Sequence, residues 1–385
     1  MKRVAAAPRS GWEARVTDVG LIYHSPDNKR YWDESVHYRL TAVDVEKLES
    51  ATDILHQMCL EAVQHVIDTD LFGVFGITEP WLINAIKLSW EKEPPSIYGR
   101  FDLVYTGKDE PKLLEYNADT PTALLEAAVV QWHWLKDIAP QGDQFNSIHD
   151  KLVAKWRELR DYLPPTPLYF GFVSDEICED LMTITYLADT AREGGLTPIP
   201  IKMVDIGLAG NGEEFFGADG TLIQTLFKLY PWEWLVNEEF GDPIIRAIDD
   251  GMVVIEPVWK MLLSNKAILA VLWDLFPNHP NLLPAMFSSS PMPAPHNRSY
   301  VVKPLLSREG ANVTIVKNCR IDAKTDGEYG EEGYVYQAIA DIEVDGKFPV
   351  FGSWVIDGEA AGVGILESDT PITGNLSRFV PHLME

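Results

Sequence analysis

The sequence predicts a mixed α/β (α+β) fold of two or three lobes. The pattern in residues 168–204 indicates a strand, a helix and a second strand, which is typical of a parallel sheet layer. Residues 100–117 contain two short strands around a polar turn and predict an antiparallel hairpin. From residue 300 onward, short β-branched and aromatic runs indicate a β-rich portion. With 385 residues, 46% of them hydrophobic, the chain can bury a large core.

Before the hairpin, the sequence predicts mainly helices. Residues 1–40 are aromatic and polar, and we expect them to wrap a surface. Residues 41–68 have the spacing of a long amphipathic helix that begins at Thr41, with Asp44 in its first turn. A second helix is expected over residues 80–91.

After the hairpin, helices and strands alternate until the β-rich portion begins. Helices are expected over 123–135 and 150–161, from about 174–180 to 193, and over 265–276. Strands are expected over 168–173, 197–204, 253–258, 300–303, 313–316, 334–342, 350–356 and 362–366. The run of Ser, Pro, Met and Ala over 288–295 is typical of a linker.

The hairpin places two carboxylates opposite each other. When the strands are folded about the turn 107–110, Asp102 faces Glu115 and Arg100 faces Asn117. Strand side chains alternate between faces, so these four project from one face together with Val104 and Leu113. The other face then carries Phe101, Leu103, Leu114 and Tyr116.

Like charges directly opposite each other destabilise a sheet, so the facing carboxylates require an explanation. A Mg²⁺ ion is one, because it binds carboxylate, amide and phosphate oxygens. The neighbouring Arg100 suggests that a phosphate is bound as well. The alternative is a solvated hairpin face with weak ion pairs.

The loop after the hairpin favours the ligand-binding interpretation. Asp119, Thr120 and Thr122 lie directly before the apolar stretch 123–130. One of them is expected to cap that helix, whose N-terminus would attract an anion. A second acidic pair, Glu179 and Asp180, follows a predicted buried strand. The alternative is that this pair only favours the first turn of its helix.

The net charge of −26 makes nucleic acids and anionic membranes improbable partners. The same charge would attract a cationic amine, or it serves only to keep the protein in solution. Cys59, Cys178 and Cys319 are far apart, which fits a reducing compartment, and no export signal or membrane span is evident. We therefore expect a cytoplasmic protein.

Residues 303–313 have the pattern of a flap between two strands. Lys303 ends the first strand, and Arg308, Glu309 and Gly310 lie in the loop. Backbone N–H groups near Gly310 and the ammonium group of Lys303 suit a nucleotide phosphate. Taken alone, this is equally a common hairpin turn.

Together, these motifs resemble the ATP-grasp carboxylate–amine ligases, and specifically the synthetase domain of the glutathionylspermidine synthase family. The resemblance extends from near Tyr31 to the C-terminus. It is carried, in order, by Arg100-Phe101-Asp102, Glu115 to Asp119, Glu179-Asp180, Asn265 to Leu269, Lys303 to Asn312 and Tyr336-Gln337. It implies an ATP-grasp architecture with a preceding α/β substrate lobe and a β-rich lid.

The resemblance also implies roles for individual residues. Asp102, Glu115 and Asn117 would bind Mg²⁺, and Arg100 would stabilise the transferred phosphoryl group. ATP would contact Lys266, Lys303, Arg308, Glu309, Gly310, and the strand Gln337, Ala338, Ile339 and Ala340. Without these neighbours, Lys266 would be an amphipathic helix residue and Lys303 an exposed strand-end lysine.

Substrate contacts are implied for Thr120, Thr122, Glu179 and Asp180. The chain departs from the family at several positions: Leu366 replaces a late arginine, and Ser377 or Arg378 replaces an acidic residue. Leu229 and Trp234 stand near positions of substrate-contacting threonines, and there is no N-terminal amidase portion. The acid, which we expect to be peptide-like, and the amine are therefore not identified.

From this pattern we expect an ADP-forming ligase that joins an acid to an amine through an acyl phosphate. The alternative, suggested by Leu366, is an ATP-binding protein of the same fold that has lost ligase activity. The expected divisions are an N-terminal region (1–95), the hairpin and core helices (96–165), the substrate lobe (166–260), the nucleotide lid (261–345) and the return to the core (346–385).

Overall fold

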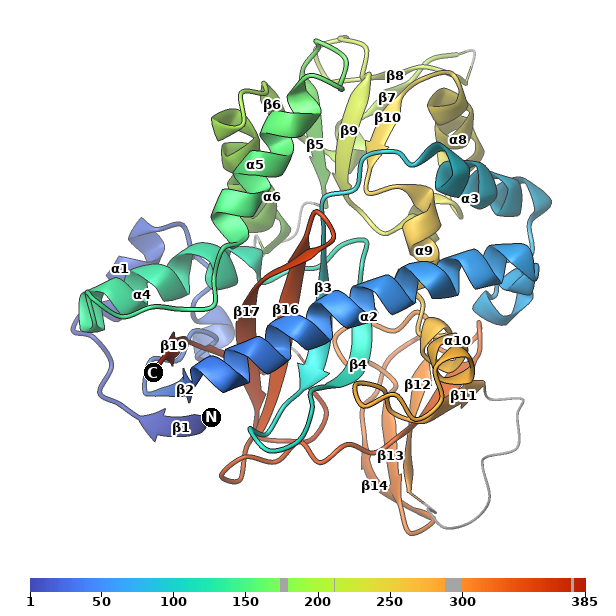
Figure 1. Ribbon diagram of the computed structural model, residues 1–385. Helices are drawn as coiled ribbons and strands as arrows, with labels where there is room; N and C mark the ends of the chain where they lie inside the picture. The colour runs from blue at the N-terminus through green and yellow to red at the C-terminus, as the bar shows by residue number, and fades with distance from the viewer. Residues whose placement is uncertain (174–178, 211, 288–298, 375–376) are drawn as a thin grey trace.

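The computed structural model describes residues 1–385 except 174–178, 211, 288–298 and 375–376 (Figure 1). The predicted linker at 288–295 lies outside the described residues. The predicted mixed α/β fold is confirmed: the described chain forms several sheets with helices around them. None of the described helices is long and apolar enough to cross a membrane.

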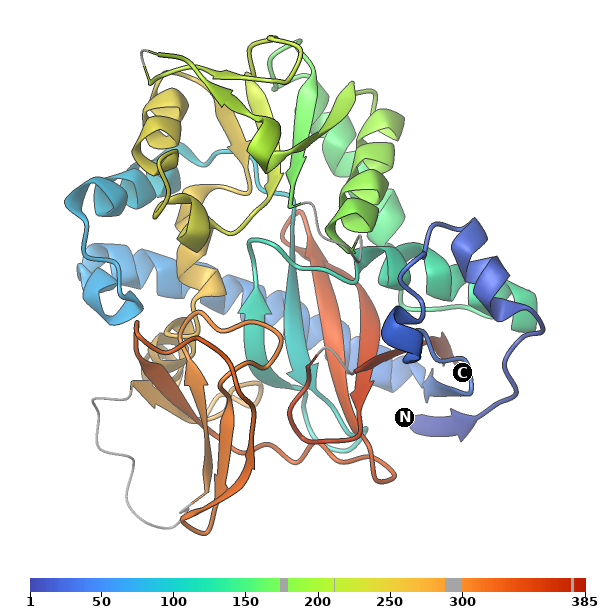
Figure 2. The same cartoon turned by 180° about the vertical axis from the view of Figure 1, so that it is seen from behind.

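The central sheet joins two distant parts of the chain (Figures 1 and 2). Its five antiparallel strands have the order β18-β17-β16-β3-β4. The hairpin supplies β3 (Tyr98–Val104) and β4 (Lys112–Asn117). The C-terminal part supplies β16 (Phe348–Ile356), β17 (Glu359–Ser368) and β18 (Arg378–Val380). The hairpin is therefore held beside strands that lie about 250 residues further along the chain.

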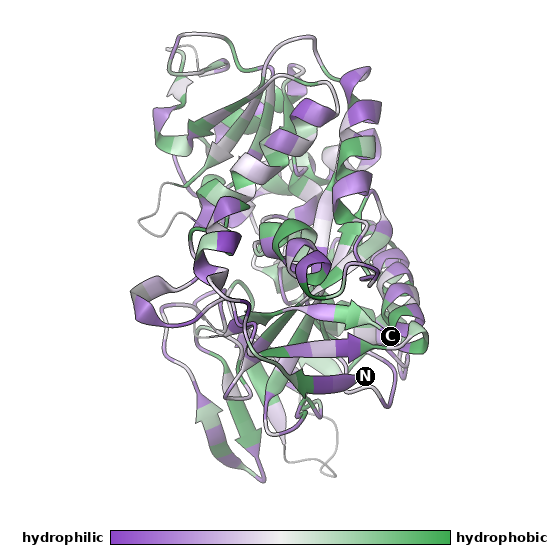
Figure 3. Ribbon diagram, turned by 90° about the vertical axis from the view of Figure 1, so that its left-hand side faces the viewer, coloured by the Kyte–Doolittle hydropathy of each residue, from purple (hydrophilic) through white to green (hydrophobic). Residues whose placement is uncertain are grey.

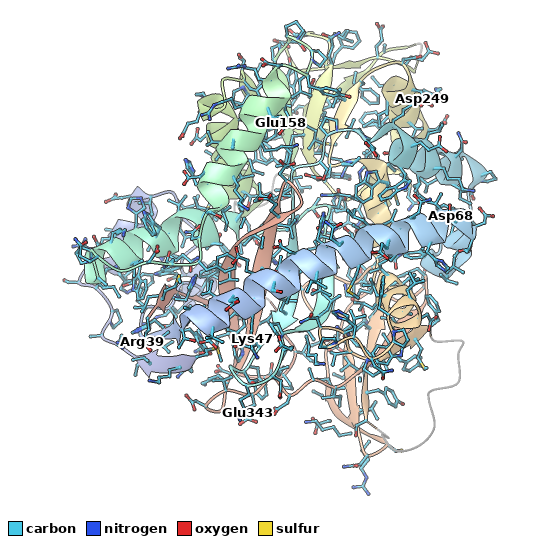
Figure 4. All side chains as sticks on the ribbon, viewed as in Figure 1. Arg39, Lys47, Asp68, Glu158, Asp249 and Glu343 are labelled. Carbon is cyan, nitrogen blue, oxygen red and sulfur yellow. The ribbon has the colours of Figure 1, made fainter. Side chains whose placement is uncertain are left out.

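Helix α2 (Ala42–Asp68) covers one face of this sheet (Figure 1). It begins at the predicted residue, where the Asp44 N–H donates to Thr41 Oγ1 and the Thr41 N–H donates to the Asp44 carboxylate. Lys47 and Asp68 mark the two ends of the helix in Figure 4. Seen from behind in Figure 2, the opposite face of the sheet is not covered by α2.

The second sheet is parallel, as the strand–helix–strand pattern predicts. Its order is β10-β9-β5-β6, from β5 (Leu168–Phe172), β6 (Pro198–Lys202), β9 (Thr225–Leu229) and β10 (Val253–Ile255). Helix α6 (Glu179–Glu193) connects β5 to β6, and α5 (Ile148–Arg160) packs against α6. The carboxyl end of β5 therefore points toward the start of α6.

The β-rich region forms a third sheet with the order β11-β15-β12-β13-β14. The strands are β11 (Ala285–Phe287), β12 (Tyr300–Pro304), β13 (Thr314–Lys317), β14 (Arg320–Lys324) and β15 (Tyr334–Ala338). Strand β15 is shorter than the predicted 334–342, because the chain leaves the sheet after Ala338, whose N–H donates to the carbonyl of Pro284.

The two ends of the described chain meet in a small sheet that the sequence did not predict (Figure 1). Strand β2 (Val36–Leu40) pairs with β1 (Lys2–Ala5) and, in parallel, with β19 (His382–Met384). The remaining elements are α1 (Trp12–Asp18), α3 (Pro80–Lys92), α4 (Gln131–Ile138), β7 (Gly207–Leu208), β8 (Phe215–Phe216), α7 (Trp232–Leu235), α8 (Gly241–Asp249), α9 (Met261–Ser264) and α10 (Ile268–Leu275).

Apolar side chains fill the space between these layers, and Figure 3 shows green segments gathered in the strands. One core cluster lies around α2 and the central sheet and includes Leu55. In that cluster the rings of Phe101 and Tyr116 stack, with centroids 3.8 Å apart. A second cluster, with Trp156 and Phe170, packs α5 and α6 against the parallel sheet.

The hairpin register is confirmed at its polar end and differs at the other end. Asp102 pairs with Glu115 and Arg100 with Asn117, as predicted. A bulge after Asp102 then pairs Leu103 with Leu113. The extra residue, Leu114, consequently lies on the polar face instead of the core face, and Leu113 joins the core. The prediction was therefore wrong for both leucines, because each lies on the opposite face of β4 from the one expected.

The helix after the hairpin also differs from the prediction. It includes a π-helical turn, η3 (Glu126–Val130), and the backbone of Ala123 is left-handed, with φ of 62°. No side-chain capping hydrogen bond is made at the start of η3. Asp119 is not a cap, because its carboxylate accepts hydrogen bonds from Lys228 Nζ and the Trp232 N–H.

Two buried ion pairs join the hairpin to the parallel sheet. The Asp119 and Lys228 side chains are 1% and 0% exposed and lie 2.5 Å apart. Glu256, which follows β10, pairs with Lys260 and accepts hydrogen bonds from the N–H groups of Ile97 and Tyr98. These contacts fix the hairpin strands against the ends of β9 and β10.

We expect the substitution Lys228→Met to destabilise the protein by about 3–5 kcal/mol, because it leaves the buried Asp119 without its cation. The measurement is urea-induced unfolding. A matched control is Lys151→Met, which breaks an ion pair with the exposed Glu359 and should cost about 0–1 kcal/mol. Equal losses in the two variants would show that the buried pair does not hold the lobes together.

Candidate active site

A cavity of about 880 Å³ lies at the polar face of the hairpin. The third sheet, called the lid sheet from here on, the start of α6 and the loop after β9 form its other walls. It is lined by all the predicted site residues: Arg100, Asp102, Glu115, Asn117, Thr120, Thr122, Glu179, Asp180, Lys266, Lys303, Arg308, Glu309, Gly310, Gln337, Ala338, Ile339 and Ala340. Residues separated by more than 200 positions in the sequence thus share one space.

Arg100 and Asp102 form a two-point ion pair on β3. Arg100 Nε lies 2.7 Å from Asp102 Oδ1, and Arg100 Nη2 lies 3.0 Å from Oδ2. Asn117 Nδ2 also donates to Asp102, at 3.2 Å. Arg100 Nη1 donates to the carbonyl of Thr122, so this residue contacts the arginine through its backbone. The arginine is thereby held between the hairpin and the loop that follows it.

Two residues of β16, the strand beside β3, contact Arg100, and sequence reasoning found neither of them. The guanidinium lies 5.9 Å from the ring centroid of the buried Trp354. Gly352 pairs with Asp102, and a Cβ atom there would lie 2.8 Å from Arg100 Cδ. A glycine is therefore required for the arginine to lie across the neighbouring strand.

Glu115 is paired with lysines from two other elements. Lys266 Nζ lies 3.0 Å from Glu115 Oε2 and also donates to the carbonyl of Ser307. Although burial opposes it, the ammonium groups of Lys266 and Lys303 lower the pKa of Glu115 to about 2. Burial raises the pKa of Asp102, against the effect of Arg100, and the Glu115 carboxylate adds to the rise.

Lys303, on β12 of the lid sheet, is buried, and its side chain is held by Gln337. Its Nζ donates to Gln337 Oε1 at 2.8 Å and to the carbonyl of Leu114 at 3.0 Å. Burial lowers the pKa of Lys303 to about 8, with Glu115 opposing and Lys266 adding to the decrease. Gln337 lies on β15, whereas Ile339 and Ala340 follow the end of the strand. The side chain of Gln337 thus connects the lid to the hairpin.

Arg308 connects the flap loop to the loop that follows the hairpin. Its Nη1 donates to Thr120 Oγ1 at 3.0 Å, and its Nη2 donates to Glu233 at 2.8 Å. The guanidinium also lies 5.5 Å from the ring centroid of Trp234. The flap turns at Gly310, where a Cβ atom would lie 2.2 Å from the carbonyl oxygen of Thr373. Sequence reasoning did not find Glu233, because nothing in a single chain links it to Arg308.

The acidic pair Glu179 and Asp180 begins α6 and lines the cavity. Four positions at which the sequence analysis expects departures from the family also line the cavity: Leu229, Trp234, Leu366 and Ser377. Arg378, by contrast, donates to Glu367 and Asp369.

Glu126 is a buried carboxyl group that the sequence analysis did not single out. It is 3% exposed and accepts a 2.8 Å hydrogen bond from the hydroxyl of Tyr31, which lines the cavity. Burial raises the pKa of Glu126 to about 7, and the nearby Glu179 adds to the rise. Its sequence context is an apolar helix, so only the structure places it behind the cavity.

The donor set on the hairpin fits a cation that also binds phosphate. Within the described ranges, no three His, Cys, Asp or Glu side chains are grouped as a metal site. Asp102 and Glu115 supply only two carboxylates, and the amide nitrogen of Asn117 is turned toward Asp102, which leaves its oxygen for a cation. Mg²⁺ characteristically uses one or two carboxylates and completes its shell with water and phosphate oxygens.

Comparison with known proteins identifies the family of the chain. Residues 3–385 match the glutathionylspermidine synthase preATP-grasp family. The chain belongs to this family. A Haemophilus influenzae protein named "Putative acid--amine ligase" is 41% identical, over 99% of both chains. The fold prediction, an ATP-grasp architecture with an α/β lobe and a β-rich lid, is confirmed.

More distant relatives are longer than this chain. Trypanothione synthetase of Crithidia fasciculata is 28% identical over 84% of this chain and 53% of its own length. The bifunctional glutathionylspermidine synthetase/amidase of Escherichia coli is 27% identical over 85% and 55%. The chain thus matches about half of these two relatives. A glutathione synthetase-like effector from Globodera pallida shares the fold, with a TM-score of 0.61 over 99% of this chain and 98% of that one, at 7% identity.

The raised pKa of Glu126 predicts a specific pH dependence of stability. Between pH 4.5 and about 7 the folded state binds a proton that the unfolded chain has released, so stability decreases as the pH rises. The variant Glu126→Gln lacks this group. Relative to wild type, it should therefore gain roughly 3 kcal/mol between pH 4.5 and pH 8. Urea unfolding at both pH values measures the difference, and a constant difference would contradict the raised pKa.

Proposed function

We propose that this protein is an ATP- and Mg²⁺-dependent carboxylate–amine ligase that forms an amide through an acyl phosphate. One observation carries the proposal: in a chain of this ligase family, the hairpin carboxylates, Arg100 and two lysines face one cavity. In an enzyme of this kind, ATP transfers its γ-phosphoryl group to the acid, and an amine then displaces the phosphate. The family's relatives support ligase chemistry but do not identify the acid or the amine.

Each group on the hairpin has a role in this proposal. Asp102, Glu115 and Asn117 would hold Mg²⁺, which would neutralise the nucleotide phosphates when bound. Lys266 and Lys303 would contact those phosphates, because both ammonium groups already lie beside Glu115. Arg100 would stabilise charge on the transferred phosphoryl oxygens. Catalysis of this kind depends mostly on positioning and electrostatics.

The flap and the loop that follows the hairpin would enclose the reaction. Arg308 already connects the flap to Thr120, so a nucleotide bound beneath Glu309 and Gly310 would lie beside the acid. Closure over the acyl phosphate would exclude water, which would otherwise hydrolyse it. Glu179 and Asp180 would attract the amine, and the strand Gln337 to Ala340 would contact the adenine.

A second candidate follows from Leu366, which lines the cavity at the position of the family's late arginine. Loss of that cation would weaken phosphate stabilisation. The protein would then bind ATP without ligating and act in regulation or binding. Phosphate release on mixing Mg-ATP with a panel of acids and amines distinguishes the two functions, because only a ligase depends on both substrates.

Both candidates predict that Mg-ATP stabilises the protein. At a nucleotide concentration one hundred times Kd, binding adds about 2.7 kcal/mol to the free energy of unfolding. We expect a rise in melting temperature with Mg-ATP, and a smaller rise without Mg²⁺ or in Asp102→Asn and Glu115→Gln. The measurement is thermal unfolding by calorimetry. If wild-type protein shows no rise, it does not bind ATP.

The substitution Arg100→Ala should lower substrate-dependent phosphate release by a factor of at least about 10²–10³, because the developing charge loses its donor. Nucleotide binding should be largely retained. Arg3→Ala is a matched control, since Arg3 forms a similar two-point pair with Glu367 and does not line the cavity. Wild-type turnover in Arg100→Ala would refute the role of Arg100.

A further inference from the structure

Tyr31 and Glu126 form a hydrogen-bonded pair that the proposed ligase chemistry has not used. Tyr31 lines the cavity, and its hydroxyl donates to Glu126 Oε1 at 2.8 Å. Glu126 is on the π-helical turn η3, and such turns occur frequently at functional sites. Within the described part of the chain, no Lys, Arg or His lies within ion-pair distance of Glu126. The carboxyl group is therefore buried with a neutral partner.

The surroundings of Glu126 let it exchange a proton near neutral pH. Burial disfavours its charged form, and repulsion from Glu179 has the same direction. The Tyr31 hydrogen bond and the Arg100 guanidinium favour the charged form. These opposing effects leave the pKa at about 7, where the group can both accept and release a proton.

The elements packed against η3 contact it through neutral groups. From α4, Gln131 Nε2 donates to the carbonyl of Ala127. From the segment before α5, Asn146 Nδ2 donates to the carbonyl of Ala128. From β17, Gly364 approaches Ala127 closely. Among titratable or charged groups, Tyr31, Glu179 and Arg100 have the largest effects on Glu126.

Tyr31 is also placed between the two charged parts of the site. Both Arg100, which is paired with Asp102, and Glu179, which begins α6, act on its hydroxyl. In the proposed reaction Arg100 stands at the phosphoryl group and Glu179 at the amine. A hydroxyl under the influence of both is therefore close to where the amine meets the acyl phosphate.

We propose that Tyr31, backed by Glu126, accepts the proton that the attacking amine must lose. This rests on the ligase function proposed above. An alkylamine with a pKa near that of lysine, about 10.4, arrives as an ammonium ion and cannot attack until it is deprotonated. Tyr31 is the group that touches the amine, and Glu126 is a positioning residue that acts through Tyr31.

The proposed step balances in protons and electrons. The ammonium gives one proton to the Tyr31 oxygen, while the Tyr31 hydroxyl proton passes to the Glu126 carboxylate. The neutral nitrogen forms its bond to the acyl carbon, and the carbon–oxygen bond to phosphate breaks, with the electron pair leaving on phosphate. The second nitrogen proton leaves with the phosphate. Glu126 then returns its proton through Tyr31 to solvent.

The first test needs no substrate. Infrared spectroscopy of the full chain should show the carbonyl band of a protonated carboxyl group that disappears between about pH 6 and pH 8. The band should be absent in Glu126→Gln and should titrate at a different pH in Tyr31→Phe. Tyr38→Phe is the matched control, because Tyr38 donates to the buried Glu367 outside the cavity. A band that titrates below pH 5, or persists in Glu126→Gln, would overturn the inference.

The second test distinguishes a loss of proton acceptance from a loss of the step that activates the acid with ATP. Wild-type protein and the same variants are given Mg-ATP, a panel of amino acids and short peptides including glutathione, and one of two nucleophiles. Hydroxylamine is largely uncharged at neutral pH and needs no acceptor, so hydroxamate formation should be retained in Glu126→Gln and Tyr31→Phe. Amide formation with spermidine or methylamine should fall by about 10²-fold at pH 7 and recover at higher pH.

The outcomes distinguish the inference from the function on which it rests. Hydroxamate in every variant, together with loss of amide formation only in Glu126→Gln and Tyr31→Phe, supports the inference. Wild-type amide rates and pH profiles in these two variants overturn it and leave the ligase function intact. If wild-type protein forms no hydroxamate with any acid of the panel, the ligase function fails and the inference fails with it.

Discussion

The structure depends on the need to neutralise two carboxylates that face each other across a hairpin. Asp102 and Glu115 occupy directly opposed positions on β3 and β4, in a chain that already carries a net charge of −26. Arg100 on β3 compensates the charge of Asp102. Lys266, which lies before α10, and Lys303, on β12, compensate the charge of Glu115. The lid and the helices below it are thereby fixed around the hairpin, because the charges would otherwise repel. This arrangement is the basis of the nucleotide and Mg²⁺ site proposed above.

The same hairpin also holds the parallel sheet in place. The loop after the hairpin carries Asp119, which is buried against Lys228 of β9. At the start of β3, the N–H groups of Ile97 and Tyr98 donate to the Glu256 carboxylate. Buried pairs of this kind contribute little net stability, but breaking one is costly. They therefore act as constraints on geometry more than as sources of stability. Three sheets meet at the hairpin, and their meeting point is where the cavity lies.

The sequence predicts what local rules determine, and misses what depends on distant partners. The register of Asp102 and Glu115 follows from strand alternation and the turn, and the start of α2 follows from Thr41 and Asp44. The bulge at Leu114 and the small sheet of β1, β2 and β19 have no local signature, because their pairing is non-local. The site lysines were predicted because several motifs occur in order, which is information that no single motif contains. Tyr31 and Glu126 are 95 residues apart, and only the fold brings them together.

The charges in the cavity are arranged in two groups that share Arg100. Lys266 and Lys303 act on Glu115 together with Arg100, and on the other side Glu179 acts on Tyr31 and Glu126 together with the same arginine. In the proposed reaction, an anionic nucleotide would be attracted to the lysines and a cationic amine to the acidic residues, so each ligand would favour its own end of the cavity. Leu366 and Ser377 are uncharged, so they affect the shape of the cavity without altering this division. In the proposed ligase, the electrostatics would therefore determine the order of the groups along the cavity, and the shape of the cavity around Leu366 and Ser377 would determine which acid and which amine fit.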